Sequence, residues 1–235
     1  MTRPAARLRY ALFDLDNTIY PPDSGLWEAI GERINLYMVR RLGLDPREAG
    51  ARRESYLAAF GTTLNGLRRE YGIDALDFLE FVHDLPLEHY LRHDAELDAM
   101  LSRLPLAKAI LTNADAPHAR RVLARLGVAR HFDRIIDIHA LEFVNKPDRG
   151  AYLRALELLG ARPEECIFLE DSPRNLLPAR ELGMHTVLVG GEAPGQGIDH
   201  RIARLLDLEA VLEGVLQVAP ELRRGGGPAQ QPPTG

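Results

Sequence analysis

Short apolar runs alternate with longer amphipathic segments over most of the chain. Five of these runs have the length and composition of buried strands: 8–13, 108–111, 134–138, 166–169 and 186–189. Apolar residues recur at helical spacing between and after them, which predicts helices over 94–104, 116–126, 149–159, 173–182 and 205–216. Strands that alternate with helices in this way form a parallel sheet with helices on both faces. The pattern therefore predicts an α/β protein.

One long helical stretch interrupts this rhythm just after the first strand. Residues 21–93 carry no strand signal, and their spacing predicts helices over 26–42, 46–60, 63–71 and 74–82. We therefore expect a Rossmann-like core made of residues 1–20 and 94–222, with a helical domain of residues 21–93 inserted after the first strand. The tail, 223–235, has no apolar side chain beyond one alanine and is expected to be disordered.

Composition excludes several classes of protein. With 235 residues, of which 46% are hydrophobic, the chain can bury a sizeable core. A net charge of −5 gives no sign of nucleic-acid binding. The only cysteine, Cys166, cannot form an intramolecular disulfide and suits a reducing compartment. Without a signal peptide or an apolar run of membrane-spanning length, we expect a cytoplasmic protein with no membrane partner.

The first strand ends in two aspartates that stand one residue apart, Asp14 and Asp16 in the sequence FDLDNT over 13–18. Side chains alternate faces along a strand, so the carboxylates would point the same way, unless the turning chain offers one backbone carbonyl instead. Two crowded carboxylates repel each other, and a divalent cation or a shared proton would offset the repulsion. Ligands of open α/β sheets bind at this end of the strands. The segment is therefore a candidate site, although a plain polar turn uses the same residue types.

Polar residues also follow other strands. Thr112-Asn113 ends the second strand, Glu170-Asp171 ends the fourth, and Lys146 lies in the loop after the third. Since the C-terminal ends of parallel strands share one edge of the sheet, we expect these groups near the two aspartates. Acidic side chains there could hold Mg²⁺, and a threonine hydroxyl, a backbone amide and an ammonium group could hold phosphate. A carboxylate that faces the phosphorus could act as nucleophile.

Each of these groups also has a purely structural interpretation. Thr112-Asn113 could cap the helix that begins at Ala116. Lys146 could belong to a plain helix start, and Asp171-Ser172 could be an N-cap before Pro173. The occurrence of all of them at strand ends favours one shared site.

The order of these motifs resembles that of the haloacid dehalogenase superfamily, and the match extends from the first strand to about Leu188. The resemblance implies that Asp14 is a nucleophile that forms an aspartyl-phosphate and that Asp16 is the general acid and base. It also implies that the inserted helices form a cap over the site.

The remaining roles are also implied by this resemblance. Thr112, Asn113 and Lys146 would bind the phosphate group of the substrate. Mg²⁺ would be held by Asp14, Asp16 and Asp171, while the participation of Glu170 and Asn175 is left open.

The residue at position 16 distinguishes two reaction classes within the superfamily. Members that cleave carbon–halogen bonds lack an acid there, whereas phosphatases need one to protonate the leaving alkoxide, so Asp16 favours phosphoryl transfer. An aspartate with an ordinary pKa of about 3.9 is only about one part in a thousand protonated at pH 7. We therefore expect a raised pKa for Asp16, through the charge of Asp14 or desolvation, and an ionised Asp14.

Three segments in and next to the predicted cap indicate which phosphate ester is the substrate. The segments over 16–21, 60–67 and 81–84 are similar to the pyrimidine 5′-nucleotidase group, which implies hydrolysis of UMP, CMP or related monophosphates. The segment Gly61–Asn65 offers hydroxyls and an amide that could contact a base or a sugar. We interpret His83 and His89 as surface or capping residues, and Tyr56 and Phe60 as part of the cap's own core.

Two alternatives remain open. One is a phosphatase of the same fold that acts on phosphoglycolate or a sugar phosphate. The other is a signalling receiver that is phosphorylated on aspartate as a switch, although receivers need no helical cap. For both phosphatase interpretations, the nucleotidase and the phosphoglycolate or sugar phosphatase, the expected partner is a small phosphate ester and not a nucleic-acid polymer. The sequence does not fix the oligomeric state.

Overall fold

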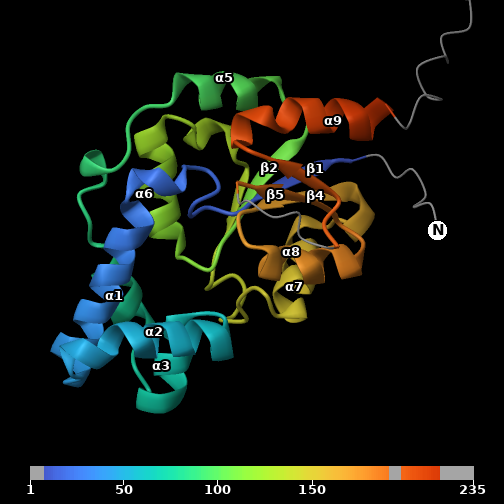
Figure 1. Cartoon of the computed structure of the whole chain (residues 1–235). Helices are drawn as coiled ribbons and strands as arrows, with labels where there is room; N and C mark the ends of the chain where they lie inside the picture. Colours follow the sequence, from blue (N-terminus) through green and yellow to red (C-terminus); the bar gives the residue numbers. More distant parts are fainter. Residues whose placement is uncertain (1–7, 191–196, 218–235) are drawn as a thin grey trace, which may run out of the picture.

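The computed structural model describes residues 8–190 and 197–217, which form a parallel sheet, flanking helices and a separate group of inserted helices (Figure 1). Within these ranges the sheet has six strands in the order β3-β2-β1-β4-β5-β6. Their bounds are β1 Tyr10–Phe13, β2 Ala107–Leu111, β3 Arg134–Ile136, β4 Cys166–Glu170, β5 His185–Val189 and β6 His200–Ile202. All strand pairs are parallel. The predicted α/β class is confirmed, and β6 is a strand that the apolar pattern did not predict.

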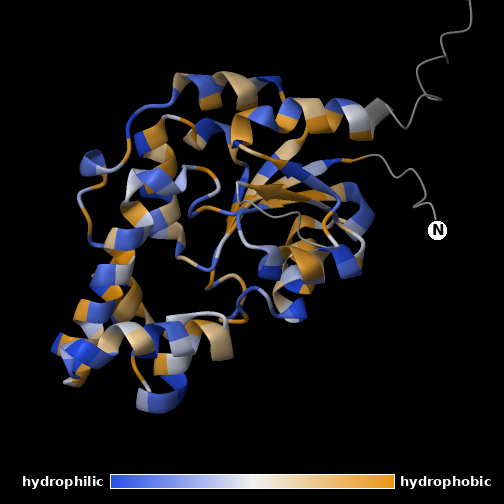
Figure 2. Ribbon diagram, viewed as in Figure 1, coloured by the Kyte–Doolittle hydropathy of each residue, from blue (hydrophilic) through white to orange (hydrophobic). Residues whose placement is uncertain are grey.

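The sheet separates two apolar clusters, as alternation along each strand requires. In β1, Ala11 and Phe13 face one cluster and Leu12 faces the other. The first cluster includes side chains of α5 (Ala95–Arg103), α6 (Ala116–Leu126) and α9 (Leu208–Gln217). The second includes side chains of α7 (Arg149–Leu159) and α8 (Pro173–Leu182). In Figure 2 the strands are mostly apolar, and the helices carry both apolar and polar residues.

Four helices form the insertion that follows β1: α1 Leu26–Leu42, α2 Pro46–Phe60, α3 Thr63–Tyr71 and α4 Ala75–His83. Asp45, Thr62 and Asp74 each cap the following helix by accepting a hydrogen bond from its first turn. The buried faces of these four helices form a third apolar cluster, which contains Tyr37 and Phe78. The exact domain boundaries stay predictions, and the tail expected to be disordered, 223–235, lies outside the described residues.

The inserted helices contact the core at several points near the strand ends. Asn65 donates hydrogen bonds to the backbone oxygen of Phe143 (3.0 Å) and to the side chain of Asn145. From the core, Arg174 donates to the carbonyls of Leu57 and Ala58, at the end of α2, over 2.8 and 3.0 Å. The insertion is therefore seated on the edge of the sheet where the polar strand ends lie. No helix in the described part of the chain is both long enough and apolar enough to cross a bilayer.

Gly61 packs closely against the loop that carries Asn145 and Lys146, and this contact leads to a stability prediction. Its φ is +78°, and a Cβ there would lie 2.3 Å from Asn145 Nδ2 and 3.1 Å from the backbone oxygen of Lys146. We expect Gly61→Ala to lower the free energy of unfolding by about 2–5 kcal/mol, because left-handed strain and overpacking both act. Urea denaturation measures the change.

Gly43→Ala is the matched control for this substitution. Gly43 ends α1 as Gly61 ends α2, its φ is +71°, and a Cβ there would meet nothing within 4 Å. Only the left-handed strain of about 1–2 kcal/mol should therefore apply. Equal losses in the two variants would show that the insertion does not press on the core at Gly61.

Candidate active site

A buried lysine joins two carboxylates at the C-terminal edge of the sheet. The ammonium of Lys146 lies 2.7 Å from Asp14 Oδ1 and 2.7 Å from Glu170 Oε2, and its side chain is 1% exposed. Asp14 directly follows β1, Glu170 ends β4, and Lys146 lies in the loop between β3 and α7. Charge-assisted hydrogen bonds of this length are the strong ones. The contact therefore brings together three segments that are far apart in the sequence, as predicted.

Three acidic side chains lie close together beside the Lys146 ammonium. Single carboxylate oxygens of Asp14, Glu170 and Asp171 lie within 4.8 Å of one another. Burial, reinforced by the charge of Glu170, raises the pKa of Asp14 to about 8 although Lys146 opposes the shift. Burial likewise raises the pKa of Glu170, to about 7, and that of Asp171.

The charge balance of this cluster fits a divalent cation. One ammonium cannot neutralise three carboxylates, and hard cations such as Mg²⁺ take carboxylate oxygens as ligands. Asp14, Glu170 and Asp171 are therefore side chains that could hold such an ion. The Asp16 carboxylate does not belong to this cluster, and a role for Asp16 as a metal ligand through its backbone carbonyl stays a prediction.

Asp16 lies apart from this cluster and has different neighbours. Its Oδ1 accepts a hydrogen bond of 2.6 Å from the Tyr20 hydroxyl and lies 3.5 Å from Nε2 of His118. Burial alone would raise the pKa of Asp16, but these two contacts outweigh burial and hold it below its usual value.

The predicted pKa shifts of the two aspartates were wrong: the pKa of Asp14 is raised and that of Asp16 is lowered, the opposite of the expectation. Burial, reinforced by the charge of Glu170, disfavours the charged form of Asp14, while the histidine and the tyrosine favour the charged form of Asp16. The sequence revealed the two aspartates but not these neighbours.

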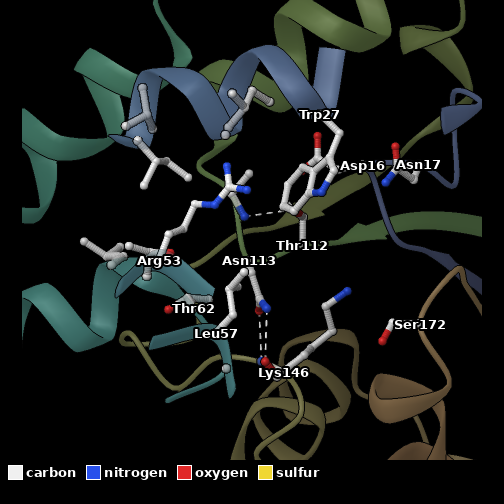
Figure 3. Close-up of a pocket in the computed structure, with 18 of the residues that line it drawn as sticks. Asp16, Asn17, Trp27, Arg53, Leu57, Thr62, Thr112, Asn113, Lys146 and Ser172 are labelled. Atoms are coloured by element: carbon white, nitrogen blue, oxygen red, sulfur yellow. Dashed lines mark hydrogen bonds between the residues drawn. The ribbon is translucent and has the colours of Figure 1, made fainter. Parts of the chain in front are cut away.

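Asn113 and Thr112 have different tasks at the end of β2. The Asn113 amide donates to the backbone oxygen of Lys146 (3.0 Å) and accepts from its backbone nitrogen (2.9 Å), as the dashed lines in Figure 3 show. Asn113 thus fixes the main chain that carries the buried ammonium. The Thr112 hydroxyl accepts from the backbone nitrogen of Ala114 at 3.0 Å and also lines the cavity described below.

A cavity of about 600 Å³ lies between the strand ends and the inserted helices. Asp14, Asp16, Thr112, Lys146 and other residues that follow the strands line the core side of the cavity, and residues of the insertion line the opposite side. Figure 3 shows residues from both sides. Four buried polar atoms in its lining have no hydrogen-bond partner among the described residues: Asn17 Oδ1, Asn35 Oδ1, Arg53 Nε and Thr63 Oγ1. Because buried polar groups are normally hydrogen-bonded, this lining suits a polar ligand of small-molecule size.

The predicted recognition segment, Gly61–Asn65, divides into different roles. Thr62 accepts from the backbone nitrogen of Asn65, so it is an N-cap, and the Asn65 amide binds the core. Only Thr63 keeps a free hydroxyl at the cavity.

Two interpretations of aromatic and histidine residues had different outcomes. Tyr56 is 3% exposed and packs in the cluster of the insertion, which confirms its structural role. His83 was predicted as a surface or capping residue, and this was wrong, because it is 7% exposed and lines the cavity. Nothing in the local pattern distinguishes a histidine at the end of a helix from one that docks against a neighbouring domain.

Comparison with known proteins gave consistent matches. A family model described as haloacid dehalogenase-like hydrolase matches residues 8–183. Phosphate metabolism protein 8 of Saccharomyces cerevisiae is 30% identical over 191 residues, which cover 75% of this chain and only 60% of that protein. Hexitol phosphatase A of Escherichia coli is 28% identical over 64% of this chain and 81% of its own length.

Solved structures show the same fold. An HAD phosphatase from Thermococcus onnurineus superimposes with a TM-score of 0.63 at 22% identity, covering 88% of this chain and 99% of that one. A β-phosphoglucomutase from Clostridium difficile gives a TM-score of 0.61 at 18% identity, over 90% and 98% of the two chains.

The two lysines of the chain provide a test of the charge arrangement. Lys146→Met leaves buried carboxylates without their cation, which costs about 3–5 kcal/mol of unfolding free energy near pH 8. The loss should shrink towards pH 5. A carboxylate whose pKa is higher in the folded state than in the unfolded state destabilises the folded state as the pH rises from the lower pKa to the higher one. At low pH the carboxylate is protonated in both states, and this destabilisation disappears. Denaturation at both pH values, with EDTA present, measures it.

Lys108→Met is the control, because Lys108 is also buried but donates only to the backbone oxygens of Leu104 (2.9 Å) and Leu106 (3.0 Å). Its substitution should cost about 1–3 kcal/mol, with little dependence on pH. A pH-independent loss in the Lys146 variant would contradict the view that this lysine compensates buried negative charge.

Proposed function

Because this chain belongs to the haloacid dehalogenase-like hydrolases, we propose that it is a Mg²⁺-dependent phosphatase of small phosphomonoesters that works through an aspartyl-phosphate on Asp14. The observation that carries the proposal is the buried contact of Lys146 with Asp14 and Glu170 at the sheet edge, beside a cavity with unpartnered polar atoms. The family resemblance of the four motifs supports it, and so do the phosphatase names of relatives.

In the proposed mechanism, residues of this site act in each step of phosphoryl transfer. An Asp14 oxygen attacks the phosphorus and forms the acyl phosphate, while the bond to the leaving oxygen breaks. Lys146 offsets charge on the transferring group, and Asp16 gives its proton to the leaving oxygen. Asp16 then takes a proton from the water that attacks the phosphorus, which releases phosphate and restores Asp14.

Two features would set the protonation states for these steps. When bound by Asp14, Glu170 and Asp171, Mg²⁺ supplies positive charge that favours the ionised form of Asp14. A phosphate dianion near Asp16 disfavours its charged form and so raises its pKa towards that of a useful acid. The bound state would thereby reverse the directions found in the ligand-free structure.

We also propose that the helical insertion, residues 21–93, is a cap that selects the substrate, and that this is a pyrimidine nucleoside 5′-monophosphate. Arg53 of α2 and Trp27 of α1 line the cavity across from Lys146 (Figure 3). Trp27 is 40% exposed, and it offers an aromatic face to a planar base. Arg53 offers an N–H donor to the ring carbonyl that UMP and CMP share. With a single free cysteine, which is buried, we place the protein in the reducing cytoplasm.

A second candidate is a sugar phosphate. Its support is the similarity to hexitol phosphatase A. The unpartnered atoms of Asn35 and Thr63 could contact sugar hydroxyls as well as a base.

Phosphate release from a panel of esters tests the proposed function. We expect UMP and CMP to be hydrolysed in preference to AMP, GMP, phosphoglycolate and glucose 6-phosphate, and EDTA to abolish turnover. Asp14→Asn should lower kcat at least about 10³-fold, because the variant lacks the nucleophile. Asp133→Asn, which changes an exposed aspartate, is the control and should keep wild-type activity.

Each outcome of this panel has a distinct meaning. Turnover confined to hexose phosphates or phosphoglycolate would overturn the pyrimidine proposal and keep the mechanism. Ordinary turnover by the Asp14→Asn variant would overturn the mechanism itself.

Arg53 gives a sharper test of substrate recognition. We expect Arg53→Met to raise KM for UMP about 10- to 100-fold with a smaller change in kcat, because a hydrogen bond from a charged group contributes about 1.5–3 kcal/mol. KM for p-nitrophenyl phosphate, which has no pyrimidine ring, should change much less.

Arg52→Met is the matched control, since Arg52 is the neighbouring residue but pairs with Glu70 on the surface of the insertion. It should leave both KM values near those of the wild type. A similar rise in KM for both substrates in the Arg53 variant would show that Arg53 binds phosphate rather than the base.

A further inference from the structure

We propose that His118 is a positioning residue for Asp16, and that His83 of the inserted helices holds His118 in place, so that the proton-transferring carboxylate is aligned only while the insertion is seated on the core. This inference rests on the proposed function of Asp16. Its test separates failure of the inference from failure of that function.

His118 is placed by the start of α6. This helix follows the end of β2, so its first turn lies beside the C-terminal edge of the sheet. Asp115 caps the helix and accepts a hydrogen bond of 3.3 Å from the backbone nitrogen of His118. The His118 side chain is fully buried, and its Nε2 lies 3.5 Å from Asp16 Oδ1. Catalytic contacts are often long in ligand-free structures and shorten when substrate binds.

The carboxylate of Asp16 has a second neighbour on the same oxygen. The Tyr20 hydroxyl donates to Oδ1 over 2.6 Å. These two contacts on one oxygen, from a tyrosine and a histidine, restrict the rotation of the carboxylate. Because Tyr20 lies in the loop after β1 and His118 lies in α6, the orientation of Asp16 depends on two separate elements of the core.

His83 connects this arrangement to the insertion. It is the last residue of α4, and its ring stacks on that of His118 with centroids 4.1 Å apart and planes 13° apart. Nδ1 of His83 lies 2.9 Å from Asp115 Oδ1. The same carboxylate therefore caps the helix of His118 and contacts the ring that packs on His118.

Backbone contacts fix His83 on the core as well. Arg121, one turn after His118 in α6, donates to the carbonyl oxygens of His83 (2.8 Å) and Leu85 (2.5 Å). The end of α4 is thus bound to α6 through main chain and side chain together. If the insertion moved away, His118 would lose the ring that packs against it, and Asp16 would lose its alignment.

Leaving groups of different stability provide the test. UMP releases an alkoxide, which needs a proton from Asp16, whereas p-nitrophenyl phosphate releases a phenolate that is stable at neutral pH without one. The ratio of kcat/KM for the two esters therefore reports on proton donation. It includes only steps up to departure of the leaving group, so the later hydrolysis of the aspartyl-phosphate does not enter.

We expect His118→Ala to lower kcat/KM for UMP at least about tenfold more than that for p-nitrophenyl phosphate, within the range typical of general acid catalysis. His83→Ala should shift the ratio in the same direction by a smaller factor. His118→Gln should restore most of the ratio, because its amide nitrogen can occupy the place of Nε2.

His131→Ala is the matched control. His131 also contacts an aspartate, with its Nε2 2.7 Å from Asp98 Oδ1, but it lies in the turn before β3 and does not line the cavity. Its ratio should equal that of the wild type, and thermal melts of all variants monitor folding.

An unchanged ratio in folded His118→Ala would overturn the inference while leaving the proposed function intact. If that variant does not fold, unchanged ratios in both His118→Gln and His83→Ala would overturn it. Absence of any turnover in the wild-type enzyme would instead refute the proposed function, and the inference with it.

Discussion

The contact of the Lys146 ammonium with Asp14 and Glu170 is the constraint on which the site depends. A charge buried this deeply is tolerated only when opposite charges and hydrogen bonds surround it. The fold meets this requirement by bringing the ends of β1 and β4 and the loop after β3 to one edge of the sheet. Asn113 then fixes the main chain of Lys146 from the end of β2. Four segments are thus held together by polar contacts within a largely apolar core.

The negative and positive charges around Lys146 do not balance each other. One ammonium lies beside three carboxylates, and burial together with the charge of Glu170 raises the pKa of Asp14. Asp16, two residues away, has the opposite shift because a histidine and a tyrosine face it. Two neighbouring aspartates therefore differ in their environments, which is the condition for a division between nucleophile and acid–base group. The inserted helices contribute polar atoms to the cavity that have no hydrogen-bond partner among the described residues, such as Arg53 Nε and Thr63 Oγ1.

The elements of the core could be predicted from sequence because their signals are local. Apolar runs and helix caps gave strands β1 to β5 and the intervening helices nearly to the residue, and the parallel sheet then brought the strand-end residues together. Strand β6 was missed because His200–Ile202 is short and carries polar residues at the sheet edge. The first part of the predicted last helix is instead a 3-10 turn, Leu205–Asp207, before α9.

The partners of the site could not be predicted because they depend on docking between distant elements. His83 and Arg53 belong to inserted helices whose seating on the core has no local signature. The pKa of Asp14 is raised by burial and by the charge of Glu170, and the pKa of Asp16 is lowered by its contact with His118. Both of these neighbours lie over a hundred residues away in the sequence. Glu170 itself was visible as a strand-end acid, but only the geometry places it, rather than the Asp16 carboxylate, beside Asp14 and Asp171.

The central claim is that Asp14 accepts the phosphoryl group, and trapping the intermediate tests it most directly. The enzyme would be mixed with Mg²⁺ and the best ester, quenched in acid within milliseconds, reduced with borohydride and digested for mass spectrometry. Borohydride converts an aspartyl-phosphate into homoserine, so the account predicts homoserine at position 14 and unmodified aspartate at position 16. Rapid turnover without any modification at Asp14 would contradict it and would point to direct attack by water.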